Sequence, residues 1–150
     1  MKKLFPALLA IATLIFASCG GSSAPETATE ASPSTSPSSD DAPGIRLVNA
    51  DEANTIFTNP PADLVVLDVR TPEEFAEGHL EGAIMIDFYD DDFADQLAEL
   101  DPSKSYLLYC RSGNRSGQTT PILKDLGFDD VADLDGGIGT WISAGLPVTQ

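Results

Sequence analysis

One short stretch of the chain carries a thiol, two guanidinium groups and two glycines. The segment YCRSGNRSG, residues 109–117, places Arg111 directly after Cys110 and Arg115 four positions further on. A thiolate is stabilised by adjacent cations and by the amide groups at the start of a helix, and guanidinium forks suit tetrahedral oxyanions. Gly113 permits a backbone angle that a side chain would oppose. These residues predict a loop that holds a nucleophilic cysteine and binds an anion.

The apolar and helical patterns on either side of this loop predict an α/β fold. Short apolar runs without alternation, such as residues 64–67 and 106–109, are typical of strands buried on both faces of a parallel sheet. Asn49 and Thr71 are predicted helix N-caps. Strands are expected within residues 45–49, 63–69, 82–88, 105–110 and 131–137, and helices within residues 50–57, 72–77, 92–100, 116–126 and 138–145. Residues 44–150 therefore form one predicted domain, with a central, mainly parallel sheet flanked by helices.

The beginning of the chain predicts export. Residues 1–18 combine two lysines with an apolar stretch that is shorter than the roughly 20 residues needed to cross a bilayer. Small residues directly precede Cys19, which resembles the lipobox of bacterial lipoproteins. We expect a signal peptide over residues 1–18, a lipid on Cys19, and an extracytoplasmic domain anchored to a bacterial membrane. The alternatives are a secreted or soluble periplasmic protein and an uncleaved anchor helix.

The segment that follows Cys19 has the composition of a tether. Residues 20–43 are almost entirely Ser, Thr, Ala, Pro, Gly and acidic residues. Such a segment has too little apolar surface to offset the entropy of ordering, so it is predicted to be disordered. Residues 19–43 are therefore interpreted as a lipidated cysteine followed by a flexible linker.

The charge of the chain excludes one class of partner. The formal net charge is −16, and residues 44–150 alone carry 20 acidic against six basic side chains. A surface this acidic repels polyanions, so no nucleic acid partner is expected. Membrane contact is expected only through the lipid on Cys19.

Three segments together resemble the rhodanese family of sulfurtransferases. The loop CRSGNRS over residues 110–116 resembles the active-site loop of that family. LDVRTPEEFAEGHLEGAIMI over residues 67–86 and LDGGIGTWISAGLPV over residues 134–148 resemble its other two signatures. The three occur in the family's order and cover most of residues 45–148. The resemblance implies an α/β fold and a reaction that transfers sulfane sulfur through a cysteine persulfide.

The resemblance also assigns roles to individual residues. Cys110 would bear the persulfide, and Asp68 with Arg70 would support the site by ion pairing. Arg115 is expected to face an acidic partner such as Asp68. The remaining loop positions would bind the substrate; with Arg115 these are Arg111, Ser112, Gly113, Asn114 and Ser116. The implied partners are a small sulfur donor, such as thiosulfate or a persulfide, and a thiol or cyanide acceptor, which could be a protein thiol.

Neither a cofactor nor a metal is expected. His79 is the only histidine and has no neighbours at ligand spacing, which favours a structural role. The run Asp90–Asp92 lacks the glycine and terminal glutamate of a calcium loop. It is interpreted as an exposed helix start, where acidic side chains are favourable.

Spacing separates this interpretation from two related chemistries. Cysteine phosphatases surround phosphate with a C-x5-R loop, whereas Cys110 and Arg115 form the shorter C-x4-R. A thioredoxin-like role is disfavoured because no second cysteine lies near Cys110. Sulfur held on Cys110 must therefore pass to an outside acceptor.

Two other functions remain open from the sequence. Rhodanese-like domains also occur as noncatalytic sensing or interaction modules, although inactive members typically lack the cysteine that this chain keeps. A dedicated persulfide carrier would serve one protein acceptor and turn over thiosulfate poorly. A general sulfurtransferase is the interpretation that the intact loop favours.

Overall fold

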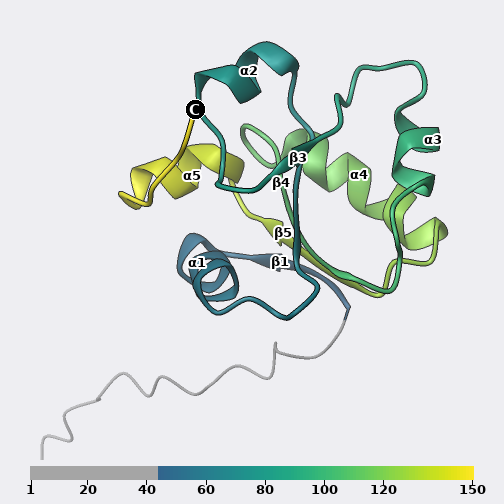
Figure 1. The fold of residues 1–150 in the computed structure, drawn as a ribbon, viewed down its shortest axis with the longest axis horizontal. Coiled ribbons are helices and arrows are strands. Elements are labelled where there is room, and N and C mark those ends of the chain that lie inside the picture. The colour runs from purple at the N-terminus through teal and green to yellow at the C-terminus, as the bar shows by residue number, and fades with distance from the viewer. Residues whose placement is uncertain (1–43) are drawn as a thin grey trace, which may run out of the picture. The chain divides into compact units, whose positions relative to one another are not determined.

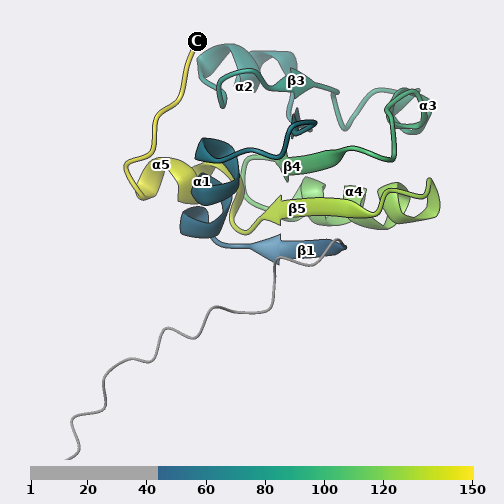
Figure 2. The same ribbon diagram turned by 60° about the horizontal axis from the view of Figure 1, so that its bottom comes forward.

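Five parallel strands form one sheet in the order β1-β5-β4-β2-β3 (Figure 2). The computed structural model describes residues 44–150. The strands are β1 (Ile45–Val48), β2 (Val65–Asp68), β3 (Ile84–Met85), β4 (Ser105–Tyr109) and β5 (Asp130–Leu134). Every neighbouring pair is parallel, so the carboxyl ends of the strands share one edge of the sheet. The predicted α/β fold with a parallel sheet is confirmed.

The helices begin at the polar residues that their capping chemistry favours. They are α1 (Ala50–Thr58), α2 (Pro72–Glu77), α3 (Phe93–Ala98), α4 (Asn114–Asp125) and α5 (Gly137–Ser143). The Asn49 side chain accepts from the amides of Asp51 and Glu52, both at 3.0 Å, and the Glu52 carboxylate accepts from the Asn49 amide. Thr71 makes the same reciprocal pair with Glu74 ahead of α2. Both predicted N-caps are confirmed, and each satisfies amides that the first helical turn leaves free.

Four of the five helices cover the two faces of the sheet in pairs (Figure 1). On one face, Ala53 of α1 and Trp141 of α5 pack into a core with Leu107. On the other face, Leu97 of α3 and Leu123 of α4 pack into a second core, which also contains Cys110. All five side chains are essentially fully buried, and burying a large apolar side chain contributes roughly 1.5–3 kcal/mol. The nucleophile candidate is therefore held by the α3 and α4 side of the domain.

The third strand is shorter than its apolar pattern predicts. A strand was expected within residues 82–88, but β3 covers only Ile84–Met85. The chain leaves the sheet because the Asp87 carboxylate accepts from the Tyr89 amide at 3.0 Å, and the Asp87 carbonyl accepts from the Asp90 amide at 3.1 Å. Such side-chain bonds favour a turn over a continued strand. Tyr89 is thereby left exposed on a loop beside α3.

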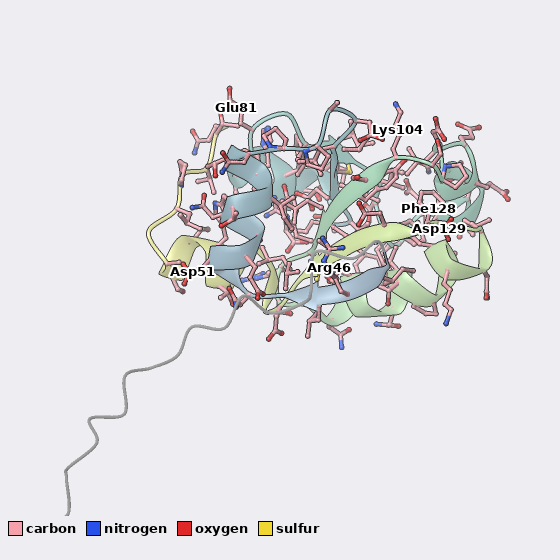
Figure 3. All side chains as sticks on the ribbon, turned by 90° about the horizontal axis from the view of Figure 1, so that it is seen from below. Arg46, Asp51, Glu81, Lys104, Phe128 and Asp129 are labelled. Carbon is pink, nitrogen blue, oxygen red and sulfur yellow. The ribbon has the colours of Figure 1, made fainter. Side chains whose placement is uncertain are left out.

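The first described strand lies at one edge of the sheet. Arg46 lies on β1 (Figure 3). Its guanidinium donates to the carboxylate of Asp130, at the start of β5, at 2.8 Å. At the other end of the chain, His79 and Thr149 form an antiparallel bridge. The C-terminus consequently lies next to α2 (Figure 1). Within residues 44–150, no helix is both long enough and apolar enough to span a bilayer.

Candidate active site

Cys110 lies at the carboxyl end of the central strand β4. Its side chain is 1% exposed, and the Gly113 amide donates to its Sγ at 3.1 Å. Gly113 has φ +86° and directly precedes α4, so the loop reverses within three residues of the cysteine. A side chain at Gly113 would be strained in that left-handed conformation. The loop therefore points backbone amides at the sulfur, as the sequence predicted.

The surroundings of Cys110 favour its ionised form. Burial is the largest single influence and by itself would raise the pKa of the Cys110 thiol. The amides of Ser116, Ser112 and Arg115, with the Ser116 hydroxyl, outweigh burial and lower the pKa below its ordinary value. Hydrogen bonds to a thiolate stabilise the charged form. The thiolate is the reactive form of cysteine, so the loop activates this group.

Glycines at the start of α5 hold the loop from behind. The Ile138 amide donates to the Cys110 carbonyl at 2.8 Å, and the Gly139 amide donates to the Arg111 carbonyl at 3.2 Å. Gly137 has φ +60°, and a Cβ there would lie 2.3 Å from the Cys110 carbonyl oxygen. Only glycine permits this approach. The segment LDGG is therefore part of the site, a role that sequence analysis did not assign.

Arg115 faces an acidic partner, as expected, but that partner is Glu74, and the suggestion of Asp68 was wrong. Its two terminal nitrogens donate to the two Glu74 oxygens at 2.7 and 2.9 Å. The guanidinium also lies 5.7 Å from the centre of the Tyr89 ring. Asp68 is unavailable to Arg115 because it is fully buried and already paired with Arg70. The Arg115 pair joins the first turn of α4 to α2.

Asp68 and Arg70 form a buried ion pair at the end of β2. Arg70 Nε lies 2.9 Å from each Asp68 oxygen, and one terminal nitrogen donates to Asp68 at 2.7 Å and to the Gly78 carbonyl at 2.8 Å. The guanidinium lies 5.6 Å from the centre of the Tyr109 ring. The Tyr109 hydroxyl in turn accepts from the Leu80 amide at 3.1 Å. Neither Asp68 nor Arg70 contacts the sulfur; the pair braces the strand next to β4.

The other predicted loop residues divide between solvent and interior. Ser116 is fully buried, whereas Ser112 and Asn114 are exposed. The Asn114 side chain accepts from Gln118 at 2.9 Å. The side chain of Arg111 is 76% exposed, with its nearest terminal nitrogen 4.0 Å from Glu74. Arg111 is thus the loop guanidinium that remains open to a ligand.

A pocket of about 300 Å³ lies beside Arg111. Its charged side chains are Arg70, Glu74, Glu77 and Arg111, and its other lining residues are Gly78, Ile138, Gly139, Ile142 and Val148. Ile142 and Val148 are large apolar side chains that are about half exposed. The pocket therefore combines one accessible cation with carboxylates and an apolar rim.

Two residues near the loop escaped the sequence analysis. Glu74 fixes Arg115, and its only sequence signal is the capping-box spacing from Thr71. Asp133, a buried carboxyl on β5, lies close to Ser116. His79 has the structural role expected of it, with its Nδ1 3.1 Å from the Phe75 carbonyl and its ring stacked on the Phe75 ring.

Two expectations from the sequence concern the absence of a metal site and a lipid on Cys19. Among residues 44–150, no group of three His, Cys, Asp or Glu side chains is placed to hold a metal ion. The predicted lipidation site, Cys19, and the predicted signal peptide and linker lie outside the described residues. They stay predictions.

Comparison with known proteins agrees with the fold. Residues 49–144 match the family described as the rhodanese-like domain, and the chain belongs to that family. A chloroplastic protein of Arabidopsis thaliana, thiosulfate sulfurtransferase 16, is 38% identical over an alignment of 91 residues that covers 54% of this chain and 76% of that protein. A sulfurtransferase of Allochromatium vinosum is 34% identical over 86 residues, covering 57% of this chain and 78% of that protein.

Solved structures show the same fold. The crystal structure of a rhodanese-related protein from Thermoplasma volcanium superimposes with a TM-score of 0.61 at 32% identity, covering 69% of this chain and 97% of that one. A rhodanese-like domain protein from Staphylococcus aureus superimposes with a TM-score of 0.58 at 26% identity, covering 71% of this chain and all of that one. The described part of the chain, residues 44–150, is thus a rhodanese-like domain with sulfurtransferase relatives.

Proposed function

We propose that this domain is a sulfurtransferase that carries sulfane sulfur as a persulfide on Cys110. The observation that carries the proposal is the amide cradle: Gly113 donates to Sγ at 3.1 Å, and the amides around Ser116 lower the pKa of the thiol despite its burial. A cradle of this kind stabilises both the thiolate and a bound sulfur anion. The sulfurtransferase relatives support the same reaction class.

The proposed reaction has two displacements. The Cys110 thiolate attacks the outer sulfur of thiosulfate; the new S–S bond forms as the old one breaks, and sulfite leaves with the bonding electron pair. A thiolate acceptor then attacks the outer sulfur of the Cys110 persulfide, forming an acceptor persulfide and releasing the Cys110 thiolate. Cyanide in the same role gives thiocyanate. Each step forms one bond and breaks one bond, and the departing sulfur keeps the electron pair, so no external oxidant or reductant is consumed.

The two loop arginines have different proposed roles. Arg111 is exposed and meets only a distant carboxylate, so it receives the anionic donor and stabilises the leaving sulfite. Arg115 is committed to Glu74 by two short hydrogen bonds, so its charge is largely neutralised and it fixes the loop. The acceptor approaches over the pocket beside Arg111, where Ile142 and Val148 offer apolar contact.

Intact mass measurement tests the proposal. The full chain with Cys19→Ser, which prevents lipidation, is incubated with thiosulfate, and a gain of one sulfur atom is expected. Cys110→Ser in the same background is the matched variant, and it should show no gain while melting at a similar temperature. Cyanide should remove the added sulfur as thiocyanate. Equal loading of the Cys110→Ser chain would refute the proposed nucleophile.

Transfer measurements separate the general enzyme from the alternatives. Rapid cyanide-dependent turnover indicates a general sulfurtransferase, whereas loading that is discharged only by one purified protein thiol indicates a dedicated carrier. A chain that never acquires sulfur from thiosulfate, polysulfide or a low-molecular persulfide is a noncatalytic module. The intact cradle around Cys110 favours the first outcome.

We also propose that the protein is a bacterial lipoprotein whose domain lies outside the cytoplasm. The proposal rests on the small residues before Cys19 and the linker composition of residues 20–43. Cys19→Ala should release the protein from washed membranes into the soluble fraction. Uncleaved chain that stays in the membranes would instead indicate an anchor helix.

A further inference from the structure

The pocket beside Arg111 carries four charged side chains, and two of them are neutralised by partners outside it. Arg70 is buried and paired with Asp68 at 2.7 Å. Glu74 accepts two hydrogen bonds from Arg115, at 2.7 and 2.9 Å. The fields of closely paired opposite charges largely cancel. Attraction of a charged ligand into the pocket therefore depends on the other two side chains.

The two remaining charges are Glu77 and Arg111, which have opposite signs. Glu77 is exposed and forms no ion pair within residues 44–150. The side chain of Arg111 is 76% exposed, and its nearest carboxylate lies 4.0 Å away. The pocket thus offers a ligand one unpaired carboxylate and one guanidinium that is open to solvent.

Glu77 lies where a carboxylate is unfavourable for its helix. It is the last residue of α2, and the free carbonyl groups at that end carry partial negative charge. No lysine or arginine lies in the last turn of α2 to offset the carboxylate. The Gln150 side chain donates to the backbone carbonyl of Glu77, so this contact does not involve the carboxylate either. Helix stability therefore does not explain an acidic side chain at this position.

The remainder of the pocket suits a small molecule with a short apolar part. The volume of about 300 Å³ is at the lower end of the range for small-molecule sites. Ile142 and Val148, which are 54% and 43% exposed, form an apolar wall. A short carbon chain can lie against this wall while a charged group at its end meets Glu77.

The pocket adjoins the loop that holds the proposed nucleophile. Two of its lining residues, Ile138 and Gly139, donate backbone hydrogen bonds to the carbonyls of Cys110 and Arg111, at 2.8 and 3.2 Å. The other walls come from α2, α5 and the C-terminal segment, which lie next to one another (Figure 1). A ligand in the pocket is therefore adjacent to the loop.

We propose that Glu77 is a specificity-determining residue, which selects small thiol acceptors that carry a protonated amine. The proposal rests on the sulfurtransferase function proposed above. The amine lies against the Glu77 carboxylate, and the acceptor thiolate attacks the outer sulfur of the Cys110 persulfide. The new S–S bond forms as the bond to Cys110 breaks, and the Cys110 sulfur leaves as a thiolate with the electron pair. The anionic donor at Arg111 and the cationic acceptor at Glu77 thus use opposite charges of one pocket.

Discharge of the persulfide tests this selection. The full chain with Cys19→Ser is loaded with thiosulfate, freed of donor, and mixed with cysteamine, mercaptoethanol or mercaptopropionate. These thiols carry an amine, a hydroxyl and a carboxylate, respectively. Loss of one sulfur atom is followed by intact mass. Each rate in a variant is divided by the rate of the parent chain with the same thiol, so that the intrinsic reactivity of the thiol cancels.

Two substitutions at position 77 have different expected effects. Glu77→Gln keeps the shape and removes the charge, so cysteamine should react about two- to fivefold more slowly, the effect of an exposed ion pair. Mercaptoethanol should react at the parent rate. Glu77→Lys places a cation at the end of a helix, which is favourable for folding. It should slow cysteamine further and accelerate mercaptopropionate.

Glu73→Gln is the matched control. It removes the same charge from an exposed residue of the same helix that does not line the pocket. All three rates should equal those of the parent chain. A parent-like cysteamine rate in both Glu77 variants would overturn the proposal, and so would equal slowing by Glu73→Gln.

A disulfide-forming reaction separates this proposal from the sulfurtransferase function. Methanethiosulfonates form a mixed disulfide with Cys110 and release methanesulfinate, so they probe the pocket without sulfur transfer. The reagent with a trimethylammonium group should slow about two- to fivefold in Glu77→Gln, whereas the methyl reagent should not. A chain that shows this effect but never acquires sulfur would refute the sulfurtransferase function and the acceptor role while supporting the cation site. A chain that acquires sulfur but shows no Glu77 effect in either reaction would refute the selection alone.

A protein thiol beside a lysine is the other source of the same chemistry. A short peptide with adjacent cysteine and lysine is therefore compared with cysteamine in the discharge reaction. Slowing of cysteamine by Glu77→Gln supports the small acceptor. Slowing confined to the peptide would overturn that assignment.

Discussion

Replacing Glu74 by glutamine should destabilise the domain through the loss of one charge. Glutamine keeps the shape of the side chain and can still accept in the capping box with Thr71. It has only one acceptor oxygen, so one of the two bonds to Arg115, at 2.7 and 2.9 Å, is lost. The guanidinium keeps its charge with only 11% of its side chain exposed. The variant therefore isolates the charge of Glu74 from its role at the helix start.

The expected cost follows from these contacts. Removing one partner of a fully buried ion pair costs about 3–5 kcal/mol, and a hydrogen bond to a charged group contributes about 1.5–3 kcal/mol. Glu74 is 18% exposed, so water partly screens the pair and about 2 kcal/mol is expected. For a domain of about 100 residues, each kcal/mol lowers Tm by about 4–8 °C. Glu74→Gln should lower Tm by roughly 8–16 °C.

Thermal and urea unfolding measure the effect against a neighbouring variant. Glu73→Gln is the control, since Glu73 is exposed and forms no ion pair within residues 44–150. Its Tm should change by less than about 3 °C, in keeping with an exposed position. Similar Tm values for the two variants would show that the Arg115 pair contributes nothing measurable.

The ion pair between Glu74 and Arg115 should make the stability of the domain depend on pH. The hydrogen bond from Arg115 is the largest influence on Glu74, and it holds the pKa of that carboxyl below its ordinary value of 4.5 despite burial. Because the pKa of Glu74 is lower in the folded chain than in the unfolded chain, its ionisation stabilises the fold at pH values above the unfolded-chain pKa. This stabilisation is lost as pH falls through the folded-chain pKa. The difference in unfolding free energy between the parent chain and Glu74→Gln should therefore shrink below about pH 4. A difference that stays constant into stronger acid would contradict this origin.

Three further changes probe the frame around the loop and the approach of donors. Gly137→Ala should lower the free energy of unfolding by about 2–5 kcal/mol, because its Cβ would meet backbone atoms of residues 110–112 at a positive φ. Gly117→Ala has open space around it and should instead stabilise α4 by about 0.5–1 kcal/mol. Urea unfolding of the two variants measures the difference. Tyr109→Phe should cost about 1–3 kcal/mol in the same assay, since the buried Leu80 amide loses its acceptor. The kcat/KM for thiosulfate should rise as ionic strength increases toward physiological values. The net charge of −14 on residues 44–150 repels a dianion, and at physiological ionic strength salt screens this repulsion over about 8 Å. A steady fall would show that attraction by Arg111 controls capture instead.

Local patterns in the sequence explain why the fold was predictable. The unbroken apolar runs around Leu67 and Leu108 indicate strands buried on both faces, and both residues are fully buried in the sheet. Asn49 and Thr71 start helices for reasons confined to four residues. The start of α4 at Asn114, two residues earlier than predicted, depends instead on the tight turn at the loop.

The parts of the site that were missed depend on distant packing. Arg115 and Glu74 are 41 residues apart, and only the rotation of α2 decides that Glu74, and not the neighbouring Glu73, faces the loop. Nothing in the sequence analysis singled out Asp133 in the strand VADLD, and the structure buries this residue. Neither outcome is encoded in the spacing of nearby residues. The turn of the loop around Cys110 was therefore predictable, whereas the side chains that support it were not.

The parallel sheet gives the two ends of the described chain unequal access to the site. β1 runs parallel to β5 and β4, so Gly44 enters at the amino edge of the sheet, opposite the edge that carries Cys110. The Gln150 side-chain amide donates a hydrogen bond to the Glu77 carbonyl, and Val148 lines the pocket beside Arg111. Immobilising the protein on a bead or electrode through its N-terminus should thus leave the reactive edge facing the bulk solution. A purification tag fused to the C-terminus would instead crowd the mouth of the pocket.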